Sequence, residues 1–128
     1  MKPSLLALAL IVASALPAYA AGDAAHGETV FKKCMACHAV GEGATNKVGP
    51  ELNDLIGRTA GTAAGYKYSN PMIDAGAAGL VWDEASLTAF LTSPKAEVPG
   101  TKMSFAGLKD ATDTADVIAY LATFSAAP

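Results

Sequence analysis

Cys34, Cys37 and His38 form the segment whose residue types and spacing point most clearly to chemistry. They occur in the order Cys34-Met35-Ala36-Cys37-His38, a C-x-x-C-H sequence. In c-type haem attachment, each cysteine sulfur forms a thioether with a haem side chain, and the histidine ligates the iron. The two-residue gap lets one helical turn span both attachment points. We therefore expect one haem c, bound covalently through Cys34 and Cys37.

Two other interpretations of these cysteines are a redox-active dithiol, or bare disulfide, and a zinc site. A dithiol oxidoreductase should bring a βαβ context, which the sequence lacks. Zinc would need a fourth ligand beyond Cys34, Cys37 and His38, and the only other histidine, His26, belongs to a predicted helix. The sequence favours haem attachment over both.

A second axial ligand should come from far along the chain, where Met72 and Met103 are the candidates. Met103 lies in the segment 99–105, a predicted loop between two helices that can reach over an open haem face. Met72 falls in the first turn of a short predicted helix, where a methionine usually fills the core. The sequence therefore favours Met103 over Met72. Ligation by a histidine and a methionine fills both axial positions, which suits electron transfer because no substrate site remains.

Short helices and long loops are predicted to position these residues. Capping residues and apolar periodicity indicate helices over about Asp23 to Cys34, from an Asn70 cap to about Gly76, from an Asp83 cap to before Pro94, and over about Asp113 to Phe124. The stretch 39–65 is mostly loop, with a short helical turn around Glu51 to Ile56. No segment alternates with period two, so the fold class is all-α. Loops this long need something to organise them, and an internal haem would do so.

Residues 1–20 have the pattern of a secretory signal peptide. Lys2 precedes the apolar run from Leu5 to Leu16, and Ala18-Tyr19-Ala20 is a cleavage site. The run is short for a membrane span, so an uncleaved anchor is less favoured. We expect one periplasmic domain, residues 21–128, with no stable membrane insertion. The formal net charge of −3 for the whole chain, or −4 without Lys2, argues against a nucleic-acid binder.

Further motifs surround C-x-x-C-H in a fixed order. Gly27 and Phe31 precede it, and the later motifs are Gly49-Pro50-Glu51-Leu52, Gly57-Arg58-Thr59-Ala60-Gly61, Tyr66-Lys67-Tyr68-Ser69, Trp82, the helix up to Pro94, Pro99-Gly100-Thr101-Lys102-Met103 and Ala119-Tyr120-Leu121. In this order they resemble the class I cytochromes c of the bacterial cytochrome c2 type, over essentially the whole mature chain. The resemblance implies the small cytochrome c fold, in which short helices and long loops wrap one covalently bound haem.

The resemblance also implies roles for individual residues around the iron, which His38 and Met103 would ligate. Pro50 would offer its backbone carbonyl to the ring N–H of His38. Arg58, Tyr68 and Trp82 would serve the buried haem propionates, as charge partner and hydrogen-bond donors.

Other positions either follow the family or depart from it. Gly27 would let the first helix approach the last one closely, with Phe31 and Tyr120 packing at the crossing. Phe90 stands where the family often has a tyrosine near the methionine sulfur, and it cannot donate a hydrogen bond. The stretch from Tyr68 to Trp82 is slightly longer than in mitochondrial members.

The function implied is that of a monomeric one-electron carrier between larger complexes of a respiratory or photosynthetic chain. Its partners would be a cytochrome bc1-type donor and an oxidase, reductase or reaction-centre acceptor. No catalytic residue is expected. One alternative is a haem peroxidase, which needs an open iron position and a distal acid–base group. The other is a structural or recognition module in which the haem only stabilises the fold. Basic side chains flank the segments expected to frame the haem edge, and they suggest a local basic ring for an acidic partner: Lys33, Lys95, Lys102 and Lys109.

Overall fold

The computed structural model describes residues 9–12 and 22–126, so the predicted signal peptide and its cleavage site lie almost wholly outside the described residues. The helices are α1 (Ala24–Phe31), α2 (Asn70–Ala77), α3 (Glu84–Thr92), α4 (Pro94–Glu97) and α5 (Ala111–Ala122). The β pairing in this part of the chain is one isolated antiparallel bridge between Thr59 and Val81. The all-α prediction is therefore confirmed. None of the helices in the described ranges is long and apolar enough to cross a bilayer.

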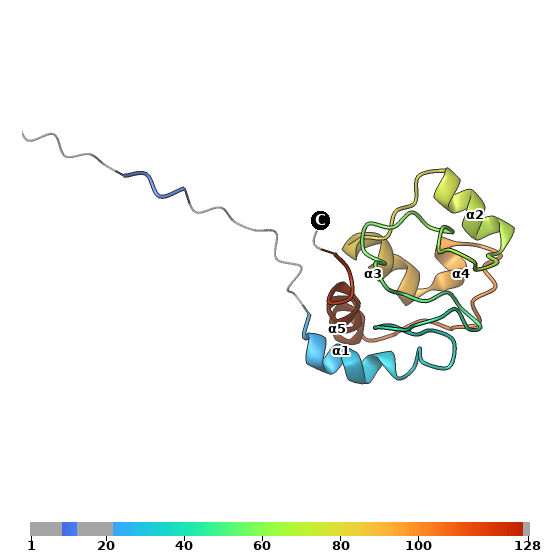
Figure 1. Ribbon diagram of the computed structural model, residues 1–128, viewed down its shortest axis with the longest axis horizontal. Helices are drawn as coiled ribbons and strands as arrows, with labels where there is room; N and C mark the ends of the chain where they lie inside the picture. Colours follow the sequence, from blue (N-terminus) through green and yellow to red (C-terminus); the bar gives the residue numbers. More distant parts are fainter. Residues whose placement is uncertain (1–8, 13–21, 127–128) are drawn as a thin grey trace, which may run out of the picture.

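Helices α1 and α5, from opposite ends of the chain, pack side by side (Figure 1). Gly27 makes this possible, because a Cβ atom there would lie 1.9 Å from the backbone oxygen of Asp116. The rings of Phe31 and Tyr120 meet at the crossing with their centroids 5.5 Å apart. Both features follow the sequence prediction, and the close approach holds the start of the C-x-x-C-H segment against the C-terminal helix.

Polar side chains cap α1, α2, α3 and α5, in places one to three residues from the predicted boundaries. Asp23 and Asp83 cap α1 and α3 as predicted, and Asp83 forms a capping box with Ser86. Ser69, rather than Asn70, caps α2 through a bond from the Met72 N–H to its hydroxyl. Asp110 caps α5, so this helix begins at Ala111 instead of Asp113.

Pro94 begins a helix as well as ending one. The sequence analysis treated it only as the limit of the preceding helix, and α4 was not predicted. In the structure α3 ends at Thr92, and Pro94 is the first residue of α4. A proline suits that position because its missing N–H has no intrahelical partner to lose there.

The predicted helical turn around Glu51 to Ile56 is wrong. Asp54 has a φ of 55° and Gly57 a φ of 87°, and such left-handed residues interrupt a right-handed helix. The backbone N–H groups here bond to the C-terminal segment instead, from Asp54 to the Phe124 carbonyl and from Ile56 to the Ser125 hydroxyl. Tertiary contacts, and not a local helix, fix this stretch of loop.

The buried core joins all of the longer helices and opens onto one internal cavity. Its buried members include Phe31 from α1, Met72 from α2, Leu87 and Phe90 from α3, and Val117, Ile118 and Leu121 from α5. Several of these side chains also line the cavity, among them Met72, Phe90 and Leu121. The core therefore forms the walls of a site as well as the contacts between helices.

Candidate haem site

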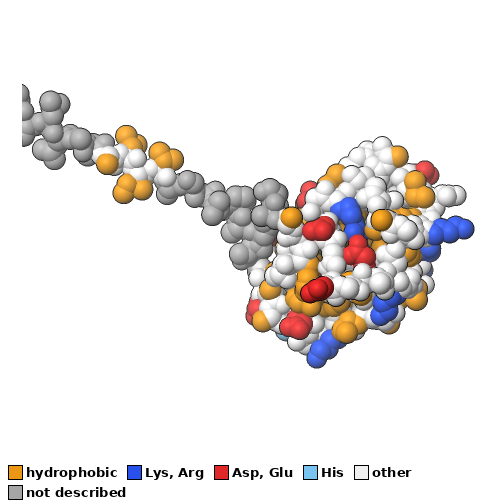
Figure 2. Space-filling model, in the orientation of Figure 1, with side chains coloured by type: hydrophobic (Ala, Val, Ile, Leu, Met, Phe, Trp, Pro, Cys, Tyr) orange, Lys and Arg blue, Asp and Glu red, His pale blue; other side chains and the backbone are white. Residues whose placement is uncertain are grey.

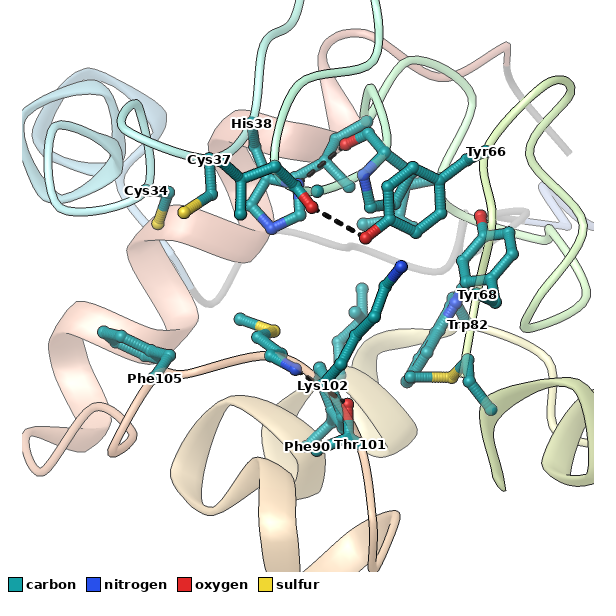
Figure 3. A pocket seen from close by; sticks show the side chains of 18 of the residues that line it. Cys34, Cys37, His38, Tyr66, Tyr68, Trp82, Phe90, Thr101, Lys102 and Phe105 are labelled. Carbon is teal, nitrogen blue, oxygen red and sulfur yellow. Dashed lines mark hydrogen bonds between the residues drawn. The ribbon is translucent and has the colours of Figure 1, made fainter. Parts of the chain in front are cut away.

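A cavity of about 260 Å³ gathers every predicted site residue into one place. Its lining includes Cys34, Cys37, His38, Pro50, Arg58, Tyr68, Trp82 and Met103. Figure 3 shows Cys34, Cys37 and His38 along one side of the cavity, with Thr101, Lys102 and Phe105 along the opposite side. Residues far apart in the sequence thus face each other across an apolar space.

The C-x-x-C-H segment is a compact turn that continues from the end of α1. The helix was predicted to reach Cys34, but it ends at Phe31, and the following N–H groups bond three residues back in tighter turns. The amides of Cys37 and His38 both donate to the Cys34 carbonyl, at 3.1 and 2.9 Å. Both cysteines are free and half-buried. Burial raises the pKa of the Cys34 thiol.

His38 is oriented by the carbonyl oxygen of Pro50, 2.7 Å from its Nδ1 atom. A carbonyl only accepts hydrogen bonds, so Nδ1 carries the proton and Nε2 is left with a free lone pair. Burial lowers the pKa of the His38 imidazole, although the bond to Pro50 opposes this shift. The ring is therefore kept neutral, as a metal-ligating histidine must be.

Gly49 allows the loop carrying Pro50 to lie against the His38 ring. A Cβ atom at Gly49 would lie 2.4 Å from Cε1 of His38, so no larger residue fits there. The Gly49 N–H also donates to the Cys37 carbonyl at 2.8 Å. These contacts fix the imidazole from both its edge and its face.

Met103 lies in a loop that is anchored at both ends. The Thr101 N–H donates to the Val98 carbonyl, and the Leu108 N–H donates to the Leu91 carbonyl in α3. Met103 is half-buried and packs against the core, and its own N–H donates to the Thr101 hydroxyl at 3.3 Å. The other candidate, Met72, also lines the cavity but is a buried core residue of α2. Met103 is the methionine on the loop opposite His38.

Arg58, Tyr68 and Trp82 bring polar groups to an otherwise apolar lining. The Arg58 guanidinium donates to the carbonyls of Asn53 and Glu51, at 3.1 and 3.3 Å. The Tyr68 hydroxyl accepts the Ala63 N–H at 3.0 Å and keeps its own proton to donate. The Trp82 ring packs on Phe90, with centroids 5.0 Å apart. Three side chains that can donate hydrogen bonds therefore line the cavity.

Tyr66 and Lys102 also line the cavity. The sequence analysis gave Tyr66 no role of its own and considered Lys102 only as part of a basic ring at the haem edge. The Tyr66 hydroxyl donates to the Val48 carbonyl at 2.7 Å, as Figure 3 shows. The Lys102 ammonium lies 4.5 Å from the centroid of the Tyr66 ring and donates to the Lys67 carbonyl. Tyr66 therefore links the loop next to Pro50 with the loop of Met103. The spacing of Tyr66 and Tyr68 could have indicated a role for Tyr66, since residues two apart in an extended segment point their side chains to the same side.

The donor set fits a covalently attached haem. Two thiols and a neutral imidazole lie on one side, a thioether-bearing loop lies on the other, and the walls between them are mainly apolar. Such a set suits an iron porphyrin, whose faces are apolar and whose iron takes nitrogen and sulfur ligands. The fold and the site together define a small all-α protein that holds a c-type haem.

Comparisons with known proteins give the same class. A family model described as cytochrome c matches residues 24–125. A cytochrome c2 of Agrobacterium tumefaciens is 55% identical over 100 residues, which cover 78% of this chain and 90% of the relative. A cytochrome c-554 of Methylosinus trichosporium is 53% identical over 126 residues, which cover 96% of this chain and 93% of the relative. The solved cytochrome c2 of Rhodospirillum centenum superposes with a TM-score of 0.78 at 46% identity, covering 82% of this chain and all of that one.

The chain therefore belongs to the cytochrome c family, as the resemblance predicted. Membership brings a covalently bound c-type haem, and Cys34 and Cys37 have the spacing that its attachment needs. The chain is an electron carrier and not an enzyme, so the peroxidase alternative is set aside.

Proposed function

We propose that this chain is a periplasmic one-electron carrier whose haem iron is ligated by Nε2 of His38 and the sulfur of Met103. The observation that carries this proposal is the pairing of His38, oriented by Pro50, with the anchored Met103 loop on the opposite side of one cavity. When bound, the haem iron supplies reversible one-electron chemistry, and histidine–methionine ligation raises its potential.

The residues of the chain each have a role in this proposal. Cys34 and Cys37 hold the cofactor covalently, so that it is kept during repeated oxidation and reduction. Pro50 fixes the tautomer of His38 and increases its basicity as a ligand. The anchors of the Met103 loop keep the sulfur in place in both oxidation states, which limits the rearrangement that accompanies each electron transfer.

Arg58, Tyr68 and Trp82 are proposed to receive the acidic side chains of the haem. These side chains are costly to bury without partners. Arg58 offers a cation, 15% exposed, at the cavity wall, and Tyr68 has a hydroxyl proton still to donate. Burial raises the pKa of the Tyr68 phenol, which keeps that proton in place.

The wider setting follows the sequence predictions. We propose that residues 1–20 direct export and are removed, that residues 21–128 form the mature monomer, and that it exchanges electrons with larger redox complexes. A cytochrome bc1-type donor and an oxidase, reductase or reaction-centre acceptor are the partners expected. The names of the relatives, cytochrome c2 and cytochrome c-554, support the carrier role.

A visible spectrum of the oxidised and reduced protein tests the ligation. Methionine on ferric iron gives a weak absorption at the red edge that is absent on reduction. Met103→Ala should abolish this band and lower the midpoint potential, while the haem stays attached through Cys34 and Cys37. Met72→Ala is the matched control and should keep the band, although it removes a core side chain. If Met103→Ala keeps the band and Met72→Ala loses it, Met72 is the ligand.

A further inference from the structure

Glu51 lies directly against Arg58 in the loop that follows Pro50. Its Oε1 atom is 3.6 Å from Nη1 of Arg58, and its backbone carbonyl accepts a bond from Nη2 at 3.3 Å. Its other carboxylate oxygen accepts the Asn53 N–H at 2.7 Å. The glutamate is therefore held in place by its own loop while it pairs with the guanidinium.

The two charges occupy different positions relative to the cavity. Arg58 is one of the lining residues and Glu51 is not, so the carboxylate lies beside a guanidinium that reaches the cavity wall without lining the wall itself. Their side chains are 15% and 26% exposed. Solvent screens partly buried charges less than it screens fully exposed ones. Both charges are thus able to influence a group that is bound in the cavity.

We propose that Glu51 sets the redox potential of the bound haem by offsetting the positive charge that Arg58 presents to the cavity. This inference rests on the proposed function, since it needs an iron that cycles between two oxidation states. Glu51 occupies the variable position of the Gly-Pro-x-Leu motif, to which the resemblance gives no role.

The sign follows from the charge change on reduction. One electron added to the iron makes the site more negative, so a nearby cation favours the reduced state and a nearby anion disfavours it. Glu51 therefore lowers the midpoint potential from the value that Arg58 alone would give. Removal of this carboxylate charge makes the site more positive, and the potential should rise.

Glu51→Gln is the direct test, because glutamine keeps an oxygen that can accept the Asn53 N–H and removes only the charge. We expect the equilibrium constant with a reference couple to shift roughly two- to fivefold toward the reduced protein, for a charge acting through a partly screened medium. At 59 mV per tenfold change, this corresponds to a rise of about 20–40 mV in the midpoint potential.

Two further variants separate charge from structure. Glu97→Gln removes the same charge from the exposed surface of α4 and should shift the potential much less. Glu51→Asp keeps the charge but shortens the side chain, and it should keep the potential close to that of the unaltered protein. The idea is wrong if Glu51→Gln shifts the potential no more than Glu97→Gln does. It is also wrong if Glu51→Asp shifts it as much as Glu51→Gln.

The visible spectrum of the unaltered protein distinguishes this failure from a failure of the proposed function. A protein that shows the methionine–iron band, but whose potential is insensitive to Glu51, retains the proposed carrier function and loses only the present inference. A protein without the band loses the proposed ligation itself.

Discussion

The Nδ1 atom of His26 in α1 lies 2.6 Å from the Oδ2 atom of Asp116 in α5. Asp116 is buried, and its other carboxylate oxygen accepts the Asp23 N–H at 2.7 Å. One carboxylate therefore ties both the cap and the first turn of α1 to the C-terminal helix. His26, which the sequence analysis considered only as a spare ligand, has a structural partner.

This pair should make the stability of the protein depend on pH. The bond to Asp116 raises the pKa of His26 above its usual value of about 6.5, with smaller contributions from the charges of Asp113 and Asp23. A raised folded-state pKa contributes stability that is fully present below pH 6.5 and is lost as the pH rises through the folded-state value. Above that value the neutral ring can still donate its Nδ1 proton, but the charge attraction is gone.

His26→Gln should remove this pH dependence. We expect the thermal midpoint of the variant to fall below that of the unaltered protein at pH 5.5 to 6, with a smaller difference at pH 8.5. Asp116→Asn, followed by NMR titration of the ring, should return the pKa of His26 toward its usual value. An equal loss of stability at every pH would contradict the charge-based argument.

Gly27 should be one of the least replaceable residues of α1. An added Cβ would lie 1.9 Å from the Asp116 oxygen and 2.8 Å from the Tyr120 Cβ, so the helices must separate. Gly27→Ala should therefore destabilise the protein by about 1–3 kcal/mol, despite the higher helix propensity of alanine. Thr29→Ala on the exposed face of α1 is the control, with an expected change within about 0.5 kcal/mol. Chemical denaturation measures both, and similar values would mean that the helix contact is easily relaxed.

Electron-transfer rates with an acidic partner should fall as salt is added. The whole chain is acidic, and the face shown in Figure 2 mixes basic and acidic side chains. Lys33 and Lys102 nevertheless both line the cavity, where docking would bring the haem close to a partner. Attraction between these lysines and the acidic partner should dominate the encounter, and added salt screens this attraction.

A neighbouring pair of lysines gives a matched test of this local effect. Lys33→Gln should slow the bimolecular rate at low salt more than Lys32→Gln, because Lys32 is exposed but does not line the cavity. Stopped-flow kinetics at several salt concentrations provide the comparison. A rate that rises with salt would show that repulsion between the whole molecules dominates.

The residues that the sequence singled out for the site lie together along one cavity, whereas the loops that carry them were predicted less well. Cys34, Cys37 and His38 stood out because their spacing matches that of covalent haem attachment, and Met103 stood out because it lies in a loop between helices. The contacts of Asp54 and Ile56 with the C-terminal segment were not predictable, since they join residues far apart in the chain. A proline such as Pro94 can end one helix and begin the next, and the sequence alone did not show that it does both here.

The ion pair of Glu51 and Arg58 shows a further limit of the same kind. The motif identified Arg58, but residue type alone does not show that Glu51 turns back toward the guanidinium. Between Glu51 and Arg58 the chain passes through left-handed residues at Asp54 and Gly57 and through contacts with the C-terminal segment. Composition and periodicity predict neither of these features, so they left the ion pair undetermined.

Phe90 offers a way to alter the iron without touching its ligands. It is buried, lines the cavity and packs on Trp82 with ring centroids 5.0 Å apart. A phenylalanine gives the proposed sulfur ligand no hydrogen bond. In Phe90→Tyr, a hydroxyl directed at the Met103 sulfur would draw electron density from it. A poorer donor favours ferrous iron, so the midpoint potential should rise.

The competing outcome for Phe90→Tyr is a hydroxyl left without a partner, which would cost about 1–3 kcal/mol of stability. Measuring the midpoint potential and the thermal midpoint together separates the two effects. Phe31→Tyr is a suitable control, because it adds the same hydroxyl to the cavity wall from α1. A raised potential with little loss of stability, seen only at position 90, supports the sulfur bond. A lowered potential at unchanged stability would refute it, because the hydroxyl would then be stabilising ferric iron.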